Sequence, residues 1–137
     1  MRTALDTNIL SSLWSNEPQA SAISTALGQA RAQGGLVISA PVFVELLAHP
    51  GVTQDFVEQF LREMGIAVDF ALEEPVWRLA ANSFALYAQR RRRSAGDSPK
   101  RLVVDFVIGS HALLHADRLM TLDPTRYSRD FPKLRIV

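Results

Sequence analysis

The sequence predicts an α/β domain built on a mainly parallel β-sheet. Short apolar runs typical of buried strands alternate with segments whose apolar residues recur at helical spacing. No linker, repeat or low-complexity tract divides the 137 residues. A chain of this length can bury roughly two thirds of its unfolded surface around one core. We therefore expect a single domain over residues 1–137.

Five short apolar segments are the expected strands. RTAL ends at Asp6, LVISA follows a Gly-Gly pair, and IAVDF follows Gly65. The expected strands cover residues 2–5, 36–40, 66–70, 118–122 and 134–137. In a parallel sheet of this kind, functional sites form beyond the carboxyl ends of the strands.

Helices are expected between these strands, because most of the intervening segments carry start or stop signals. Asp6 supplies N-cap chemistry for the first helix, and Pro18 and Pro41 lie where further helices begin. The expected helices cover 6–14, 18–33, 41–49, 53–64 and 73–93, with another around Asp105 and a turn or short helix at Asp123. The composition of residues 94–101, SAGDSPKR, predicts a loop.

Composition excludes several classes of protein. Cysteine is absent, which excludes a disulfide framework and a thiolate metal site. The N-terminal sequence MRTALDTNIL lacks the features of a signal peptide, and no segment approaches the ~20 apolar residues of a membrane span. We expect a cytoplasmic protein that does not act on membranes.

The charge is divided unevenly along the chain. Residues 1–89 carry 4 basic and 9 acidic side chains, a net −5, while residues 90–137 carry 11 and 5, a net +6. A basic half favours a polyanionic partner such as nucleic acid. Within it, the run Arg90, Arg91, Arg92 and Arg93 suits either a solvated helix end or phosphate contacts. The sequence supports these two interpretations equally.

Four acidic residues interrupt apolar surroundings. Asp6 and Asp123 each end an expected strand, while Glu45 and Asp105 are each the only charged residue of a long apolar stretch. Taken singly, Asp6 or Asp105 could cap a helix, Glu45 could pair with His49, and Asp123 could serve only the turn. Taken together, they predict one acidic site near the carboxyl edge of the sheet.

Such a site needs a cation. Two carboxylates ~5 Å apart repel by roughly 3 kcal/mol at an effective dielectric near 20. Because the sequence places no Lys or Arg beside Asp6, Glu45 or Asp105, we expect a metal ion. Oxygen ligands without cysteine favour Mg²⁺ or Mn²⁺ over zinc. The expected chemistry is metal-assisted phosphodiester hydrolysis.

Two features of the segment around Asp105 carry further expectations. Gly109 and Ala112 share a helix face with Asp105, so we expect that face to pack closely against the sheet edge. His111 and His115 are spaced like a zinc pair, but no third ligand accompanies them. We expect them to be surface or interface histidines.

The four acidic motifs resemble one family in order and spacing. LDTN at Asp6, VELLA at Glu45, DFVIGSHAL at Asp105 and MTLD at Asp123 resemble the PIN-domain ribonucleases, most of all the VapC-like toxins of type II toxin–antitoxin pairs. The resemblance spans essentially the whole chain. It implies a three-layer α/β/α sandwich with a mainly parallel sheet of four to five short strands.

The resemblance also implies a function and its residues. The implied activity is a Mg²⁺- or Mn²⁺-dependent endoribonuclease, usually acting on tRNA or rRNA. Asp6, Glu45, Asp105 and Asp123 match the catalytic and metal-binding acids, and Asn8 and Thr121 match supporting polar positions. The implied partners are a small antitoxin and a second copy of the chain. Residues 90–101 are more basic than the corresponding connection of the family.

Other functions stay open. A nuclease directed at DNA, a PIN nuclease that processes RNA outside a toxin–antitoxin pair, and a non-enzymatic nucleic-acid-binding domain all fit the basic second half. A haloacid-dehalogenase-like phosphatase is disfavoured, because Asn8 stands where that class has a second aspartate.

Overall fold

The structure is a computed structural model, and residues 1–94 and 102–137 are described here. The predicted loop therefore lies almost wholly outside the described residues, and only Ser94 falls within them. The elements are β1 (Thr3–Leu5), α1 (Thr7–Trp14), α2 (Ala20–Gln33), β2 (Leu36–Ser39), α3 (Ala40–Leu46), α4 (Gln54–Met64), β3 (Ile66–Asp69), α5 (Glu74–Arg93), α6 (Val103–His115), β4 (Arg118–Met120) and α7 (Thr125–Ser128).

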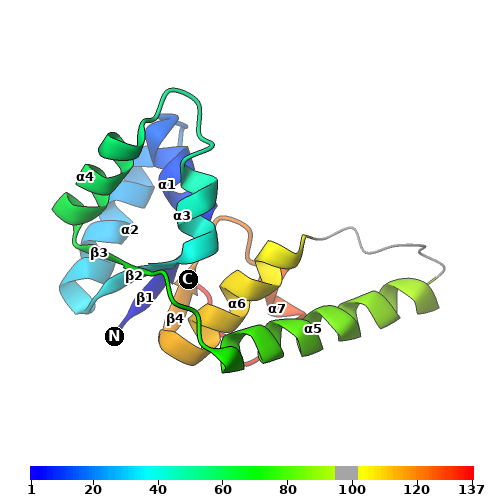
Figure 1. The fold of residues 1–137 in the computed structure, drawn as a ribbon. Helices are drawn as coiled ribbons and strands as arrows, with labels where there is room; N and C mark the ends of the chain where they lie inside the picture. The colour runs from blue at the N-terminus through cyan, green and yellow to red at the C-terminus, as the bar shows by residue number, and fades with distance from the viewer. Residues whose placement is uncertain (95–101) are drawn as a thin grey trace.

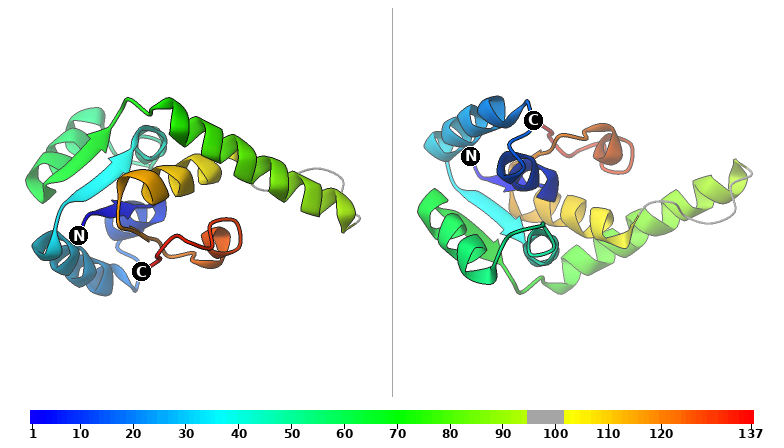
Figure 2. Two further views of the ribbon diagram at one scale, coloured as in Figure 1. Left: turned by 90° about the horizontal axis from the view of Figure 1, so that it is seen from below. Right: turned by 90° about the horizontal axis from the view of Figure 1, so that it is seen from above.

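The four strands form one all-parallel sheet in the order β3-β2-β1-β4, which confirms the predicted fold class. In register, Ala4 of β1 lies opposite Val37 of β2 and Leu119 of β4. Helices flank the sheet and complete a three-layer α/β/α sandwich (Figures 1 and 2). Because all four strands run the same way, their carboxyl ends meet at one edge.

The last predicted strand is reduced to a single parallel bridge between Leu119 and Ile136. Backbone bonds join it to β4, among them Val137 N–H to the Leu119 carbonyl at 2.9 Å. The fourth strand also ends earlier than predicted, at Met120. The Leu122 N–H donates to the side-chain oxygen of Asn8 at 3.1 Å. This backbone donor is therefore bonded to a side chain and not to a neighbouring strand.

Local signals explain where the helices begin and end. The Thr53 hydroxyl accepts the Phe56 N–H at the start of α4, and Gly65 ends the helix in the left-handed region at φ 67°. The second helix begins at Ala20, two residues later than predicted, and α3 ends at Leu46, three residues earlier than predicted.

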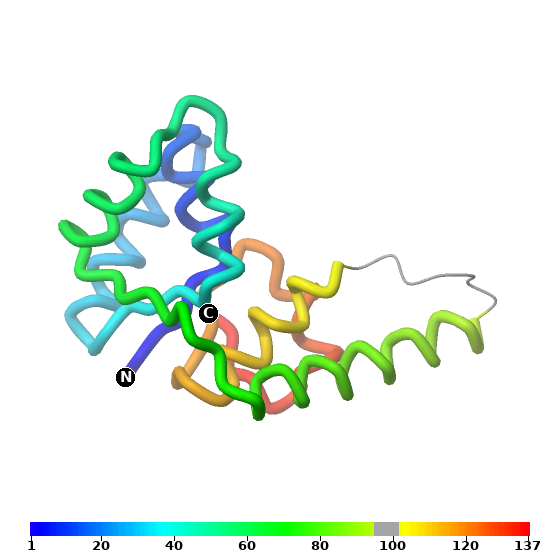
Figure 3. The backbone as a smooth tube through the Cα atoms, viewed as in Figure 1, coloured from blue at the N-terminus to red at the C-terminus, as the bar shows by residue number. Residues whose placement is uncertain are grey.

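The long helix α5 shapes the molecule near the carboxyl edge of the sheet. It starts after β3 and extends well beyond the strands, while α6 returns beside it toward the sheet (Figures 1 and 3). These two helices pack against each other more extensively than any other pair of elements. Among the described residues, no helix is long and apolar enough to cross a membrane.

Candidate active site

Asp6 lies at the junction of β1 and α1, at the carboxyl end of an inner strand. Its side chain is buried, and its Oδ1 accepts the Thr7 N–H at 2.8 Å as the N-cap of α1. Its Oδ2 accepts two hydroxyl hydrogen bonds, from Thr121 at 2.8 Å and from Tyr127 at 3.0 Å. Asp6 therefore caps a helix and also anchors a buried polar network.

Thr121 and Asn8, the two predicted supporting residues, lie together beside Asp6. The Thr121 hydroxyl donates to Asp6 and accepts the Asp123 N–H at 3.1 Å. The amide of Asn8 donates to the same hydroxyl at 3.4 Å, and its oxygen accepts the Leu122 N–H. These bonds fix the chain immediately after β4 relative to the start of α1.

Glu45 joins the network through Thr7. The half-buried Glu45 carboxylate accepts the Thr7 hydroxyl at 2.6 Å, and the Thr7 backbone N–H is bonded to Asp6. The alternative pairing with His49 is not observed, because the His49 ring lies 3.4 Å from the Ser15 hydroxyl instead. One threonine thus links two of the predicted acids.

Asp105 lies in the first turn of α6 and is 8% exposed. It is not the helix cap, because Leu102 occupies the N-cap position. Its Oδ1 lies 3.8 Å from the Arg126 guanidinium. Burial of Asp105 agrees with the apolar stretch in which the sequence places it, and a basic side chain approaches the carboxylate.

Arg126 corrects the expectation that no basic residue accompanies the acids. It lies on the short helix α7, 3.1 Å from Asp123 and 3.8 Å from Asp105. Burial opposes its charge, but the surrounding negative groups, foremost Asp105 and Asp123, together raise the pKa of Arg126 above its usual value. The sequence prediction considered only neighbours in the chain, whereas Arg126 reaches Asp105 through the fold.

Tyr127 belongs to the hydrogen-bond network of Asp6 and was missed by the sequence prediction. It is fully buried, and its hydroxyl donates to Asp6. Burial and the nearby carboxylates of Asp6 and Asp105 raise the pKa of the Tyr127 phenol, so it stays protonated as a hydrogen-bond donor. The sequence feature that could have indicated this residue is the presence of an aromatic side chain shortly after Asp123, the fourth predicted acid.

The four predicted acids are therefore joined by shared hydrogen-bond partners and by Arg126. Within residues 1–94 and 102–137, no three His, Asp or Glu side chains form a group that could hold a metal ion. The donor chemistry still suits Mg²⁺ or Mn²⁺, because carboxylate oxygens are the ligands that these hard cations prefer. The charge repulsion between the acids is offset in part by the protein's own guanidinium.

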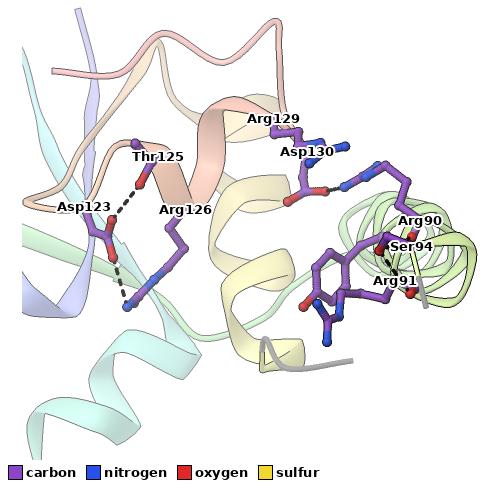
Figure 4. Close-up of a pocket in the computed structure, with 9 residues that line it drawn as sticks. Arg90, Arg91, Ser94, Asp123, Thr125, Arg126, Arg129 and Asp130 are labelled. Carbon is purple, nitrogen blue, oxygen red and sulfur yellow. Dashed lines mark hydrogen bonds and ion pairs between the residues drawn. The ribbon is translucent and has the colours of Figure 1, made fainter. Parts of the chain in front are cut away.

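A groove of about 450 Å³ opens beside this network (Figure 4). Four arginines and two aspartates contribute to its lining: Arg90, Arg91, Arg126, Arg129, Asp123 and Asp130. In Figure 4, Asp123 and Arg126 occupy one side and the arginines of α5 the other. The net positive lining suits an anionic group such as a phosphate.

The predicted arginine run divides into two pairs. Arg90 and Arg91 line the groove, and Arg90 forms an ion pair with Asp130. The Arg91 Nε is buried without a hydrogen-bond partner among the described residues. Arg92 and Arg93 are exposed and do not contribute to the lining. The sequence treated the four residues as one unit, because a run of identical side chains carries no information on which ones face inward.

The histidine expectation is wrong for His111, which is 1% exposed. Its Nε2 lies 2.8 Å from the Asp69 carboxylate, and Arg2 lies 3.6 Å from the same aspartate. Burial lowers the pKa of His111 despite this carboxylate, so the ring is neutral near pH 7. His115 is exposed, as expected.

Gly109 does pack closely, but against a different partner. A Cβ at this position would overlap the ring of Phe131, which follows α7. The absence of a side chain therefore lets the segment after α7 lie against α6.

The chain matches one known protein family over most of its length. The family model of the PIN domain matches residues 3–131. The chain belongs to the PIN domain family. This family consists of nucleases, and the match contains all four predicted acids together with Arg126 and Tyr127.

Solved structures share this PIN fold. VapBC-1 from nontypeable Haemophilus influenzae contains a chain with 22% identity and a TM-score of 0.64, and the match covers 100% of this chain and 97% of that one. VapBC2 from Rickettsia felis, solved with a DNA fragment from their promoter, contains a chain with 17% identity and a TM-score of 0.63, and the match covers 100% of this chain and 98% of that one. FitAcB from Neisseria gonorrhoeae contains a chain with 18% identity and a TM-score of 0.66, and the match covers 98% of this chain and 95% of that one. No significant match was found among curated proteins.

Proposed function

We propose that this PIN domain is a Mg²⁺- or Mn²⁺-dependent endoribonuclease and the toxin of a toxin–antitoxin pair. One observation carries the proposal: the acidic network and the basic groove share Asp123 and Arg126. Phosphodiester hydrolysis needs carboxylates for a cation and positive charge for the flanking phosphates. Here the two requirements meet at one edge of the fold.

In this proposal, Asp6, Glu45, Asp105 and Asp123 hold the divalent ion. A bound ion would supply an activated water and neutralise charge in the transition state. Thr121 and Tyr127 orient the Asp6 carboxylate, because their hydroxyls bond to its Oδ2. Asn8 holds Thr121 in turn. These supporting donors keep the carboxylate in one orientation before any substrate arrives.

The groove then takes the nucleic-acid backbone. Arginine binds phosphate oxygens through two parallel hydrogen bonds, so Arg91 and Arg129 are suited to fix the strand beside the acids. We propose RNA of the tRNA or rRNA class as substrate, because the acidic motifs resemble the VapC-like ribonucleases.

A toxin of this kind has a protein partner. The similar structures are VapBC and FitAcB proteins, and we extend to this chain a small antitoxin and a homodimer. Several large apolar side chains are exposed and available for such contacts, among them Val44, Phe70, Leu102 and Val103. We place this activity in the cytoplasm.

The second candidate is a nucleic-acid-binding domain without catalysis. It is favoured by the lack of a ready group of three metal ligands among the described residues. Such a domain would bind equally well in EDTA and after replacement of Asp6 or Asp105, because its affinity would come from the basic groove alone.

One experiment separates these functions. Purified full-length protein is incubated with total RNA, and separately with single-stranded DNA, in Mg²⁺, Mn²⁺ or EDTA, and the cut ends are mapped. The variant Asp105→Asn keeps the shape of the buried side chain and removes its charge. Asp55→Asn is the matched control. It is the same Asp-to-Asn substitution at an exposed position at the start of α4.

We expect metal-dependent cutting of RNA by the wild type and by Asp55→Asn, and at least a hundredfold loss in Asp105→Asn with the fold retained. Metal-independent binding without cutting would favour the second candidate. Cutting of DNA alone would keep the nuclease and change its substrate.

A further inference from the structure

Asp105 and Asp123 share one guanidinium. Arg126 approaches them at 3.8 Å and 3.1 Å, and its side chain is 41% exposed while that of Asp105 is 11% exposed. Part of the negative charge expected to attract a divalent ion is therefore already balanced. Any cation bound by these two carboxylates has to compete with Arg126.

Arg126 also reaches the basic groove. It lies on a helix of only four residues, and its half-exposed side chain borders the basic groove. Other groove arginines differ in this respect. Arg90 is held by Asp130 across the groove, and Arg129 has no ion pair with a described residue. Arg126 alone among the groove arginines of the described chain connects the acidic network to the groove.

We propose that Arg126 is a resident counterion of the acidic site, which releases Asp105 and Asp123 to a divalent cation and then turns its charge toward a phosphate in the groove. This inference rests on the proposed function and adds a role for one residue. Arg126 then has opposite effects on the affinity for two ligands. Its side chain weakens binding of the metal ion and strengthens binding of the nucleic acid.

The first test is metal binding without nucleic acid or catalysis. Binding of Mn²⁺ to the full-length wild type and to Arg126→Gln is measured by isothermal titration calorimetry and by the electron paramagnetic resonance signal of free Mn²⁺. We expect the variant to bind Mn²⁺ roughly 3- to 10-fold more tightly, the scale of two half-exposed ion pairs. Equal or weaker binding by the variant would overturn the proposal.

Arg129→Gln is the matched control for charge. It makes the same substitution three residues along, in the same groove, without an ion pair to Asp105 or Asp123. We expect its Mn²⁺ affinity to stay within twofold of the wild type. If Arg129→Gln tightened Mn²⁺ binding as much as Arg126→Gln, the effect would be general electrostatics and the proposal would fail.

The second test is RNA binding in saturating Ca²⁺, which occupies oxygen sites and is used here to suppress cutting. We expect Arg126→Gln to weaken RNA binding several-fold although it binds Mn²⁺ more tightly. Unchanged RNA affinity would remove the second half of the proposal.

If Arg126→Gln does not fold, NMR of the wild type provides the test. We expect Mg²⁺ to shift the Nε–Hε resonance of Arg126 and not that of the remote Arg78. No shift of the Arg126 resonance would overturn the proposal.

The outcomes also separate this inference from the proposed function. If neither the wild type nor Arg126→Gln binds Mn²⁺, both the metal site and the role of Arg126 are wrong. If both bind Mn²⁺ with equal affinity, the proposed metal site stands and Arg126 has no part in controlling it.

Discussion

The Tyr127 hydroxyl donates a hydrogen bond to Asp6 at 3.0 Å, although the two residues lie 121 positions apart in the sequence. This bond ties the segment after β4 to the end of β1 inside the fold. It also brings a neutral donor to a carboxylate that, in our account, must keep one orientation.

The Tyr127→Phe variant tests that bond through stability. Removal of the hydroxyl leaves Asp6 with its Thr121 and Thr7 donors, so we expect the free energy of unfolding to fall by about 1 kcal/mol. Urea denaturation of the two proteins measures the difference. An unchanged midpoint at unchanged slope would mean that the bond contributes nothing to stability.

The same tyrosine predicts a dependence of stability on pH. The phenol has a raised pKa in the folded state, while an unfolded tyrosine ionises near its ordinary value of about 10. Its contribution is therefore complete below about pH 10 and declines above it, by about 1.4 kcal/mol per pH unit. Urea unfolding between about pH 9 and 11 should show a steeper decline for the wild type than for Tyr127→Phe, and parallel curves would contradict this.

The Asp105–Arg126 pair predicts non-additive effects on stability. Asp105→Asn loses an attraction to Arg126 but also relieves repulsion from neighbouring acids, so we expect a change within about 1 kcal/mol. In the Arg126→Gln background the attraction to Arg126 is absent, so the same substitution should stabilise the protein more, or destabilise it less, than it does in the wild type. A double-mutant cycle is expected to give a coupling energy of about 0.5 kcal/mol, discounted for exposure. Additive effects would show that the pair is not formed in solution.

Gly109 predicts a local packing defect. A methyl group at this position would overlap the Phe131 ring, so Gly109→Ala is expected to cost about 1–3 kcal/mol of stability. Gly28→Ala is the matched control in a helix, because a Cβ there meets nothing within 4 Å. That variant should gain about 0.5–1 kcal/mol. Similar effects of the two substitutions on thermal unfolding would contradict the close contact.

The two halves of the arginine run should differ in their effect on RNA binding. Arg91→Gln removes a charge that lines the groove, and we expect the slope of log affinity against log salt to shrink by roughly 0.7. Arg93→Gln removes an exposed charge outside the groove and should leave the slope unchanged. Equal effects would indicate diffuse attraction by the whole helix end.

Most of the fold was predictable because its signals are local. Apolar runs predicted the four strands of the sheet, and caps and breakers predicted the helix ends. The N-cap of α1 is Asp6, as the sequence predicted. The length of the closing strand was overestimated. A strand extends only as far as it pairs with a neighbour, and residues 134–137 pair with β4 through one bridge, between Ile136 and Leu119. Pattern alone does not reveal the length of that partner.

The site was predictable in its acids and not in its partners. Asp6 and Asp105 stood out because charge among apolar residues is costly. Arg126 and Tyr127 lie in an ordinary polar segment, and only the fold brings them to those acids. His111 was misjudged because its partner, Asp69, lies on a strand 42 residues away.

The chemistry of the cut ends tests the central claim most directly. Attack by metal-activated water on an RNA phosphodiester leaves a free phosphate monoester on one fragment and a hydroxyl on the other, and it does not use the ribose 2′-hydroxyl. We predict that fragments made by the wild type in Mn²⁺ carry no 2′,3′-cyclic phosphate, and that a 2′-deoxy substitution at the cut position still allows cutting. Cyclic phosphate ends formed equally in EDTA would contradict the metal-dependent site of Asp6, Glu45, Asp105 and Asp123.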